Sequence, residues 1–393
     1  MLNVYFAHTS ETDDVEAAVS EILEQLDLSR LLKFSAGIMY YYADFANTGV
    51  VQRLCEELPF PVVGGTTSNS AISGSKEGIT LTISVFTSDT IAFTAGISGS
   101  LQGESFMPLE KLYKQLLEEK PAGMGEKPAM FFIAAPHFLE ITGDEYLAAL
   151  SGLSEEIPVI GSVAITNAAD FKGTKTLCNG VEYDKAMACL AFWGDLKPQF
   201  FVSEIPTEQF VNHRAVITDS YKNRIKRVNG IPVLEYLESI GLAKDGDIPG
   251  LISFPLVLHM PGGSRLIRVV YDYDEKEGEL LCSGAVPSNI PMQFSFCDKE
   301  FVLESARKTA EECKKWMETK DVSGSRTAIV ISCAARRWTL GSDVYAEIRE
   351  IDRELKDVPY HLAYSGGEFC PVYVRDEILN NCFFNFSLCI CVI

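Results

Sequence analysis

The sequence lacks long apolar runs and is short of basic residues. No stretch approaches the ~20 consecutive apolar residues that a membrane-spanning helix needs. The first residues contain no basic segment followed by an apolar one, so no signal peptide is expected. Lys and Arg total 34 against 54 Asp and Glu, which gives a formal net charge of −20. This acidity repels nucleic-acid phosphate and anionic lipid, so we predict that the protein does not bind nucleic acid. Because the sequence has neither a signal peptide nor a long apolar run, we predict a cytoplasmic protein that does not insert into a membrane.

Histidine is also scarce, and the cysteines are scattered. The chain has 5 His and 11 Cys, and only Cys389 and Cys391 lie close together in sequence. No CxxC pair exists, so no zinc-site spacing can be assembled from these residues. We therefore expect no metal and no cofactor, and we expect most cysteines to be buried thiols in a reducing compartment.

What the sequence does contain is a pattern of helix, strand, helix and strand that occurs three times. The predicted first helices are residues 13–28, 106–119 and 301–319, and the strands that follow them are residues 34–41, 129–135 and 326–332. Gly49, Gly143 and Gly341 precede the second helix of each copy, and the second interval between these glycines is close to double the first. The pattern predicts an α/β fold with mixed sheets and a divergent or inserted segment between the second and third copies.

The length of the chain predicts more than one domain. At 393 residues the chain exceeds one ordinary core, and two domains of roughly 150–200 residues are expected. Residues 215–298 are predicted to form mainly short strands and so differ from the repeated pattern of helices and strands. The linker between the two domains is predicted near residues 194–207. We therefore predict an N-terminal domain at residues 1–200 and a C-terminal domain at residues 201–393.

A loop of small residues follows the extended segment Val62-Val63. Gly64, Gly65, Thr66 and Thr67 would present backbone N–H groups and hydroxyls, which suit a carboxylate or a phosphate. The loop has no lysine and does not match GxxxxGK[ST], so it is not a P-loop. The alternative is a tight turn in which the glycines supply only backbone freedom.

A second candidate site follows the third apolar strand. Cys333 and Arg336 lie just beyond this strand, where sites of α/β sheets are favoured, and Glu368 directly follows a predicted turn at residues 364–367 of the same copy. Arg336 would bind a ligand carboxylate and Glu368 a ligand ammonium, which together would form an amino-acid clamp. The alternatives are a structural ion pair between Arg336 and Glu368, and covalent catalysis by Cys333 with His361 as the nearest base.

Arg268 is unusual because it lies within an apolar predicted strand at residues 266–273. An arginine there either extends along the surface to reach solvent or points into a polar pocket. The sequence supports both possibilities equally, and we include Arg268 among the candidate ligand-binding residues.

The residues from Cys333 onward resemble the C-terminal domain of the FIST family. The resemblance rests on residues 333–336, on residues 364–368 and on the closing segment 384–387. It implies a ligand-binding role for Gly367 and Asn385 in addition to the residues named above.

Residues 62–67 and a predicted hairpin at residues 79–97 are similar to the N-terminal FIST domain, so the resemblance covers nearly the whole chain. It implies a sensory module that binds a small ligand, for which amino acids are candidates. Members of the family are often fused to kinase, cyclase-type, chemotaxis or F-box segments. Because the resemblance continues to Ile393, we expect the signalling output to act through a separate partner protein.

We therefore predict a small-ligand-binding protein of signal transduction whose ligand is an amino acid or another small carboxylate. Two alternatives stay open, namely an enzyme that uses Cys333 as its nucleophile and an interaction scaffold with a vestigial pocket. A non-enzymatic role is favoured, because no Cys–His–Asn signature surrounds Cys333 or His361.

Overall fold

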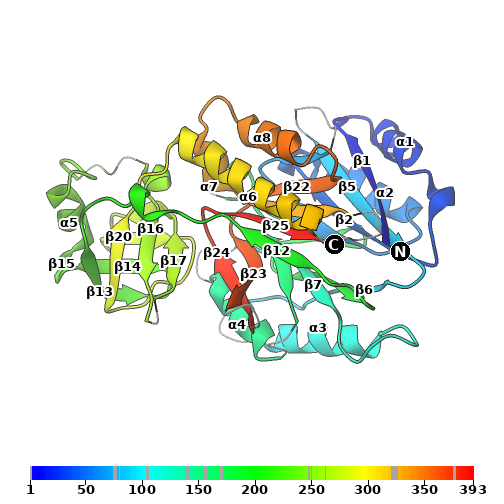
Figure 1. The fold of residues 1–393 in the computed structure, drawn as a ribbon, viewed down its shortest axis with the longest axis horizontal. Helices are drawn as coiled ribbons and strands as arrows, with labels where there is room; N and C mark the ends of the chain where they lie inside the picture. The colour runs from blue at the N-terminus through cyan, green and yellow to red at the C-terminus, as the bar shows by residue number, and fades with distance from the viewer. Residues whose placement is uncertain are drawn as a thin grey trace.

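Two parts make up the molecule in the computed structural model. Figure 1 shows a large body that contains both termini and a smaller part beside it, drawn in green to yellow. The large body consists of three units with one strand order, which we call the first, second and third strand units, and the smaller part is inserted within the third. The described residues are 2–73, 78, 80–102, 106–137, 141–153, 157–168, 171–246, 248, 250–261, 263–319, 326–374 and 378–393.

The first strand unit occupies residues 2–88. Its first helix buries four apolar residues that recur at helical spacing, and Asp14 caps the helix by accepting a hydrogen bond from the Ala17 N–H (3.0 Å). The elements of this unit are β1 (Leu2–Thr9), α1 (Val15–Leu26), η1 (Leu28–Arg30), β2 (Phe34–Tyr41), η2 (Ala43–Phe45), α2 (Val50–Glu57), β3 (Val62–Thr66), β4 (Ser70–Ile72) and β5 (Leu81–Ser88). The hairpin predicted at residues 79–97 is not formed, because its two strands belong to different sheets: residues 81–88 pair with β1 and β2, and residues 92–97 pair with a strand of the second unit. Ile79 lies outside the described residues.

The second strand unit occupies residues 92–193. Its second helix begins with a capping box, in which the Glu145 side chain accepts a hydrogen bond from the Thr142 N–H (2.7 Å). The elements of this unit are β6 (Ala92–Ile97), α3 (Met107–Glu118), β7 (Met130–Ala135), α4 (Gly143–Ser151), β8 (Val159–Val163), β9 (Thr176–Cys178), β10 (Val181–Tyr183) and β11 (Ala188–Trp193).

The third strand unit begins with one strand and resumes after the inserted domain. Its elements are β12 (Gln199–Val202), α6 (Lys299–Thr319), β21 (Ala328–Cys333), α7 (Ala334–Thr339), α8 (Ala346–Glu354), β22 (Tyr360–Ser365), β23 (Glu368–Val374), β24 (Ile378–Phe384) and β25 (Leu388–Val392). The predicted α/β class with repeated units and mixed sheets is confirmed.

The inserted domain has its own sheet and its own apolar core. The single strand predicted at residues 266–273 is two strands, which lie at opposite ends of the strand order β17-β16-β20-β13-β14-β19-β18. The elements of this domain are η3 (Thr207–Gln209), β13 (Ala215–Tyr221), β14 (Arg224–Val228), β15 (Ile231–Pro232), α5 (Val233–Ser239), η4 (Leu251–Ser253), β16 (Leu256–His259), β17 (Arg265–Arg268), β18 (Val270–Asp274), β19 (Glu279–Cys282) and β20 (Ile290–Phe294).

Each strand unit forms most of one sheet and contributes a strand to the sheet of another unit. The sheet orders are β1-β5-β2-β3-β9-β10, β6-β11-β7-β8-β23-β24 and β12-β25-β21-β22-β4. β4 of the first unit pairs with β22 of the third, β9 of the second pairs with β3 of the first, and β23 of the third pairs with β8 of the second. Strands from both sides of residue 200 therefore share sheets. How the chain divides into independently folding domains stays a prediction.

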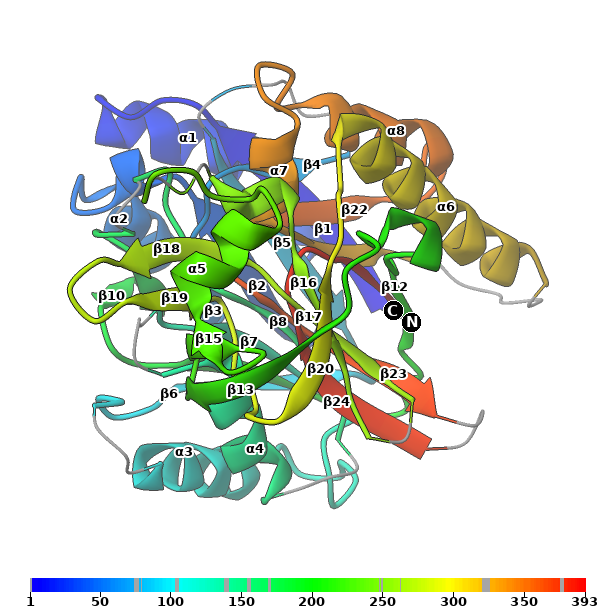
Figure 2. The ribbon, with the colours of Figure 1, turned by 90° about the vertical axis from the view of Figure 1, so that its left-hand side faces the viewer.

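The three sheets share one apolar core, and helices cover their outer faces. Ile38 of β2, Phe132 of β7 and Ile331 of β21 belong to the same buried cluster. Helices α1 and α2 pack on the first sheet, α3 and α4 on the second, and α6 and α8 on the third, as Figures 1 and 2 show. This layering buries one face of each helix and both faces of the central strands.

Two glycines allow neighbouring parallel strands to approach closely. Gly64 of β3 lies opposite Met39, and Gly161 of β8 lies opposite Ile133. A Cβ atom would lie 1.8 Å from the Met39 carbonyl oxygen at the first position and 2.0 Å from the Ile133 carbonyl oxygen at the second. The equivalent residue of the third unit is Ala363 in β22, so only the third strand pair accommodates a side chain there.

Candidate ligand-binding site

The carboxyl ends of the parallel strand pairs β2–β3, β7–β8 and β21–β22 meet at one place, which we call the strand-end junction. Three backbone N–H groups donate across it, in the pairs Ile165–Thr66 (3.1 Å), Gly366–Val163 (3.0 Å) and Tyr364–Asn69 (2.9 Å). These bonds join the second unit to the first, the third to the second and the third to the first. Because α/β proteins favour the carboxyl ends of strands for their sites, the side chains at this junction are the first candidates.

Residues 64–67 lie at the junction, but their backbone donors are already used. The Thr66 N–H donates to the Lys175 carbonyl (2.9 Å), and the Thr67 N–H donates to the Tyr41 carbonyl (2.9 Å). All four residues are buried, and the first three belong to β3. Their main role in the structure is therefore to fix the junction.

Cys333 and Glu368 form a buried pair at the same place. Cys333 ends β21 and Glu368 begins β23, and the Ser387 hydroxyl donates a hydrogen bond to Glu368 Oε2 (2.9 Å). Burial raises the pKa of the Glu368 carboxyl well above its usual range, although the Ser387 hydrogen bonds and the Arg336 charge oppose the rise. Burial and the adjacent carboxyl also raise the pKa of the Cys333 thiol. Burial thus favours the neutral, protonated form of both groups.

Gly367 and Asn385 lie next to this pair. A Cβ atom at Gly367 would lie 2.2 Å from Phe383 Cζ and 3.1 Å from Asn385 Nδ2, so a side chain at this position would displace both. Asn385 is fully buried, and no described residue accepts a hydrogen bond from its Nδ2 atom. A buried donor without a partner costs about 1–3 kcal/mol, and a bound water or ligand atom would remove that cost.

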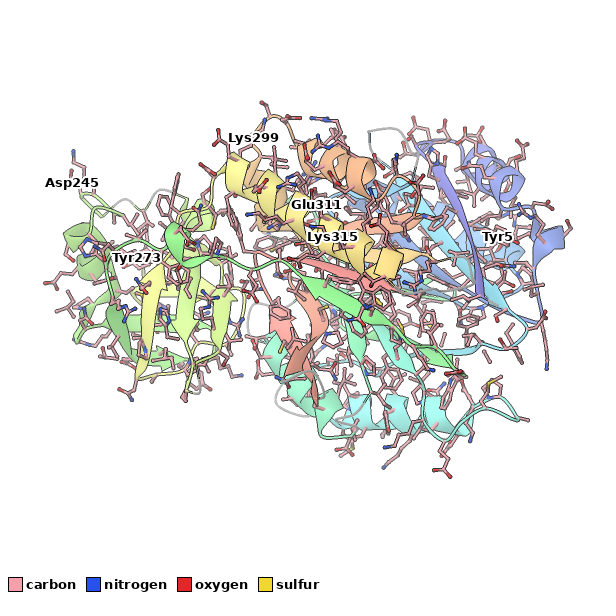
Figure 3. The ribbon with its side chains drawn as sticks, in the orientation of Figure 1. Tyr5, Asp245, Tyr273, Lys299, Glu311 and Lys315 are labelled. Carbon is pink, nitrogen blue, oxygen red and sulfur yellow. The ribbon has the colours of Figure 1, made fainter. Side chains whose placement is uncertain are left out.

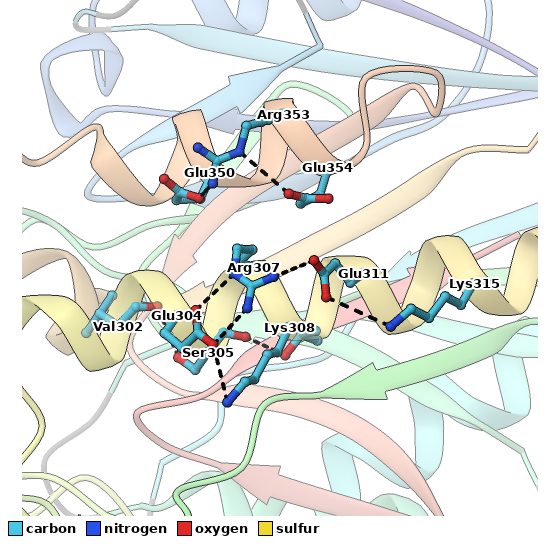
Figure 4. A network of polar contacts seen from close by, with 11 residues as sticks. Val302, Glu304, Ser305, Arg307, Lys308, Glu311, Lys315, Glu350, Arg353 and Glu354 are labelled. Atoms are coloured by element: carbon cyan, nitrogen blue, oxygen red, sulfur yellow. Dashed lines mark hydrogen bonds and ion pairs between the residues drawn. The ribbon is translucent and has the colours of Figure 1, made fainter.

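Arg336 is fully buried, and its carboxylate partner is Glu347 rather than Glu368. Its Nε and Nη2 atoms lie 2.8 and 2.6 Å from Glu347 Oε1. Nη2 also donates to the Val302 carbonyl and to Ser305 Oγ, both at 3.0 Å, and these two residues lie on α6 as Figure 4 shows. The ion pair between Arg336 and Glu368 considered from the sequence is therefore not formed, because Glu347 already balances the guanidinium charge.

Arg268 connects the inserted domain to the second strand unit. Its Nη2 atom lies 2.6 Å from Asp144 Oδ1, its Nε donates to the Ala285 carbonyl (2.9 Å), and Asp144 Oδ2 accepts from the Ala285 N–H (2.8 Å). The Arg268 side chain is fully buried, and its Nη1 atom lies 3.5 Å from Asn385 Oδ1. Arg268 thus points inward, and Asp144 fills the polar space that it faces.

The surroundings of Cys333 do not match a thiol–base pair. His361 is bonded through Nε2 to Thr82 Oγ1 (2.8 Å) and through Nδ1 to Ser84 Oγ (2.9 Å). Burial lowers the pKa of His361 to about 3, so its ring is neutral and held by these hydroxyls. A nucleophilic cysteine needs a lowered pKa and an adjacent base, and the raised pKa of Cys333 runs opposite to that requirement.

One basic residue at the junction was missed as a site residue from the sequence. Arg337 is 9% exposed, and its Nη1 donates to Asn167 Oδ1 (3.2 Å). The sequence shows two consecutive arginines, 336 and 337, but it does not show their different partners. Neighbouring residues of a helix point about 100° apart and so contact different groups. Nearby, the Tyr42 hydroxyl donates to Asn69 Oδ1 (3.3 Å).

The clefts of the surface lie beside the junction rather than in it. A cleft of about 730 Å³ runs along α6, and its wall includes Glu304, Lys308 and Glu312. Figure 3 shows the charged side chains of this helix. A cavity of about 20 Å³ is lined by His137 and Gly366. Neither space is walled by the buried pair at residues 333 and 368, so that pair lies in a closed part of the protein.

The described residues contain neither a group of metal ligands nor a helix suited to crossing a membrane. No three His, Cys, Asp or Glu side chains of that part gather as a metal site requires. Within the same residues, no helix combines the length and the apolar character that crossing a membrane demands.

Comparison with protein families gives two matches that follow each other along the chain. The model of the FIST N domain matches residues 35–231, and that of the FIST C domain matches residues 233–371. Together they take in most of the three strand units and the inserted domain. No curated protein matches the chain.

Proposed function

Because the chain belongs to the FIST family, we propose that it is a sensor that binds an amino acid or another small carboxylate at the strand-end junction. FIST domains bind small ligands in signal transduction. The observation that carries the proposal is a set of fully buried polar atoms at this junction that have no hydrogen-bond partner among the described residues. They are Arg336 Nη1, Asn385 Nδ2 and, apart from the adjacent thiol, Glu368 Oε1.

Such atoms are rare in folded proteins, and water or a ligand usually satisfies them. The N–H groups of Arg336 and Asn385 are hydrogen-bond donors and suit a carboxylate, whereas Glu368 suits an amino group. Burial raises the pKa of the Glu368 carboxyl and so favours its protonated form when no ligand is bound. A bound ammonium group would favour the charged carboxylate, so Glu368 would release its proton to solvent when an amino acid binds.

Isothermal titration tests this proposal with glycine, L-alanine, L-serine and acetate as probes. Titrations in two buffers of different ionisation enthalpy report the number of protons released. We expect heat from at least one probe, and release of about one proton for each amino acid bound. Glu368→Gln should abolish the proton release, and Glu350→Gln on the surface of α8 should not change it. Absence of heat with every probe would contradict the proposal.

We further propose that the signal passes to a separate protein and that the protein acts in the cytoplasm. All 11 cysteines are free thiols in the structure, which fits a reducing compartment. The acidic cleft along α6 offers a surface for a basic partner. Hydrogen exchange measured with and without glycine checks the output, because a transmitted signal should change exchange in α6 and not only at the junction.

The geometry does not favour catalysis by Cys333. We expect iodoacetamide to label Cys333 only when the protein unfolds, because the thiol is buried and its pKa is raised. Labelling of Cys333 in the folded protein faster than that of the partly exposed Cys55 would instead favour the enzyme. An ion pair between Arg336 and Glu368 would have favoured the scaffold alternative, whereas Arg336 pairs with Glu347.

A further inference from the structure

Arg336 and Arg337 are neighbours on α7, yet only one of them has a carboxylate partner. Arg336 pairs with Glu347, whereas no carboxylate of the described residues forms an ion pair with Arg337. The only hydrogen bond recorded for Arg337 within that part of the chain goes to the neutral Asn167 side chain, and its Nε atom is buried without a partner. At 9% exposure, Arg337 is thus a nearly buried positive charge that no carboxylate of the described residues balances.

Two buried polar groups that follow β3 have no hydrogen-bond partner among the described residues. Asn69 is fully buried, its Oδ1 accepts from the Tyr42 hydroxyl, and its Nδ2 donates to no described residue. The adjacent Ser68 hydroxyl is also buried and has no partner among the residues that the structure describes. Tyr42 links Asn69 to Arg337, because its side chain hydrogen-bonds to Asn69 and to Asn167, whose Oδ1 accepts from Arg337. The charge of Arg337 also lowers the pKa of Tyr42 against the effect of burial.

The charge count around this cluster favours one negative charge on the ligand. Glu347 is paired with Arg336, and no carboxylate of the described residues forms an ion pair with Arg337, so Arg337 contributes one unpaired positive charge among these residues. Asp44 also lies near Tyr42, but it is exposed to solvent. A guanidinium binds the two oxygens of a planar carboxylate with two parallel hydrogen bonds.

We infer that Arg337, Asn69 and Ser68 form a carboxylate-binding subsite, with Asn167 at its exposed edge. The inference deepens the proposed function, on which it rests, by moving the ligand carboxylate from Arg336, whose charge Glu347 already balances, to Arg337. A phosphate carries more charge than this subsite can balance, so a monocarboxylate is the class of ligand that it selects.

Acetate, methylamine and inorganic phosphate are the probes that test the subsite in the full-length chain. We expect acetate to bind the unmodified protein, at least tenfold more weakly to Arg337→Gln, and with unchanged affinity to Arg353→Gln, which alters an exposed arginine on α8. Acetate should also slow the modification of Arg337 by phenylglyoxal, read by peptide mass spectrometry. Equal acetate affinity in Arg337→Gln, or phosphate binding more tightly than acetate, would overturn the inference.

Asn69→Asp keeps the test decisive if Arg337→Gln does not fold. The new carboxylate would occupy the anion position beside Arg337, so this variant should lose acetate binding and unfold at a higher temperature than the unmodified protein. A lower unfolding temperature would mean that the added charge is buried unpaired, which overturns the inference. If methylamine or an amino acid binds through Glu368 while acetate does not, the subsite fails and the proposed function stands. If no probe binds, both fail.

Discussion

The second and third strand units share one strand order and differ in chemistry where their parallel strands end. The last residues paired in register are Ala135 and Val163 in the second unit, and Cys333 and Ser365 in the third. Within the described residues, the third unit alone continues from this point into a short α-helix with two buried arginines. The packed sheet requires apolar residues within the strands, and the residues just beyond them are free to vary. The comparison teaches that a repeated frame can carry its polar chemistry in one copy.

Removing the charge that balances Arg336 should have the largest effect. Glu347→Gln leaves a buried guanidinium without its counter-charge and weakens the hydrogen bond from Ser332, so the free energy of unfolding should fall by about 3–5 kcal/mol. Urea denaturation measures the loss. Glu350→Gln is the matched control, because Glu350 pairs with Arg353 at the surface of the same helix. Equal losses in the two variants would show that the buried charges of the third unit do not differ from surface charges.

The close approach of β7 and β8 gives the next largest expected effect, and it distinguishes the second strand unit from the third. Gly161→Ala would place a Cβ atom 2.0 Å from the Ile133 carbonyl oxygen, so we expect a loss of about 1–3 kcal/mol. The equivalent Ala363→Gly in the third unit should cost about 0.5–1 kcal/mol, because it adds backbone freedom without a clash. Thermal and urea denaturation compare the two variants. If Gly161→Ala left the free energy of unfolding unchanged, β7 and β8 would be able to accommodate a side chain at this position, as β21 and β22 do.

The pH dependence of stability tests the buried carboxyl of the third unit. Burial raises the folded-state pKa of Glu368 above its ordinary value of 4.5, so its contribution to stability is complete below that pH. As the pH rises further, the unfolded chain releases the proton first, and stability falls by up to about 1.4 kcal/mol for each pH unit. Glu368→Gln should remove this fall, so its stability relative to the unmodified protein should be greater at pH 8 than at pH 5. A constant difference would contradict the assignment.

Much of the frame could be predicted from the sequence, because apolar periodicity determines it. The helices predicted at 13–28 and 301–319 are α1 and α6. Of the repeated glycines, Gly49 directly precedes α2, Gly143 begins α4, and Gly341 lies in the segment before α8. The exchange of strands between units could not be predicted, since β4 and β9 are three residues long and their partners are distant in sequence.

The site could be predicted only in part, because side-chain partners depend on tertiary packing. Cys333 and Glu368 were expected just beyond strands, whereas Cys333 is the last residue of β21 and Glu368 the first of β23; the structure brings these two residues together. Glu347 could not be chosen from the sequence as the partner of Arg336, since both lie near several charged residues. Whether any of these residues binds a ligand stays a prediction.

The smallest effect is expected on the surface of the same third unit, where charges are numerous. Arg307 on α6 pairs with Glu304 at 2.8 Å and with Glu311, as Figure 4 shows, and these side chains are partly exposed to solvent. Exposed pairs contribute little, because water and salt screen them and the long side chains lose freedom. Arg307→Gln should therefore lower the urea midpoint slightly at low salt. The difference should vanish near 1 M NaCl, where the Debye length is about 3 Å.

The same salt titration applied to Glu347→Gln sharpens the contrast between buried and exposed charges. Salt cannot enter the packed space between α6 and α8, where Arg336 and Glu347 are both fully buried, so the loss in this variant should persist at high salt. If salt removed both losses equally, the interior of the third unit would be as accessible to ions as its surface. The buried charges at the strand ends would then have no special capacity to select a ligand.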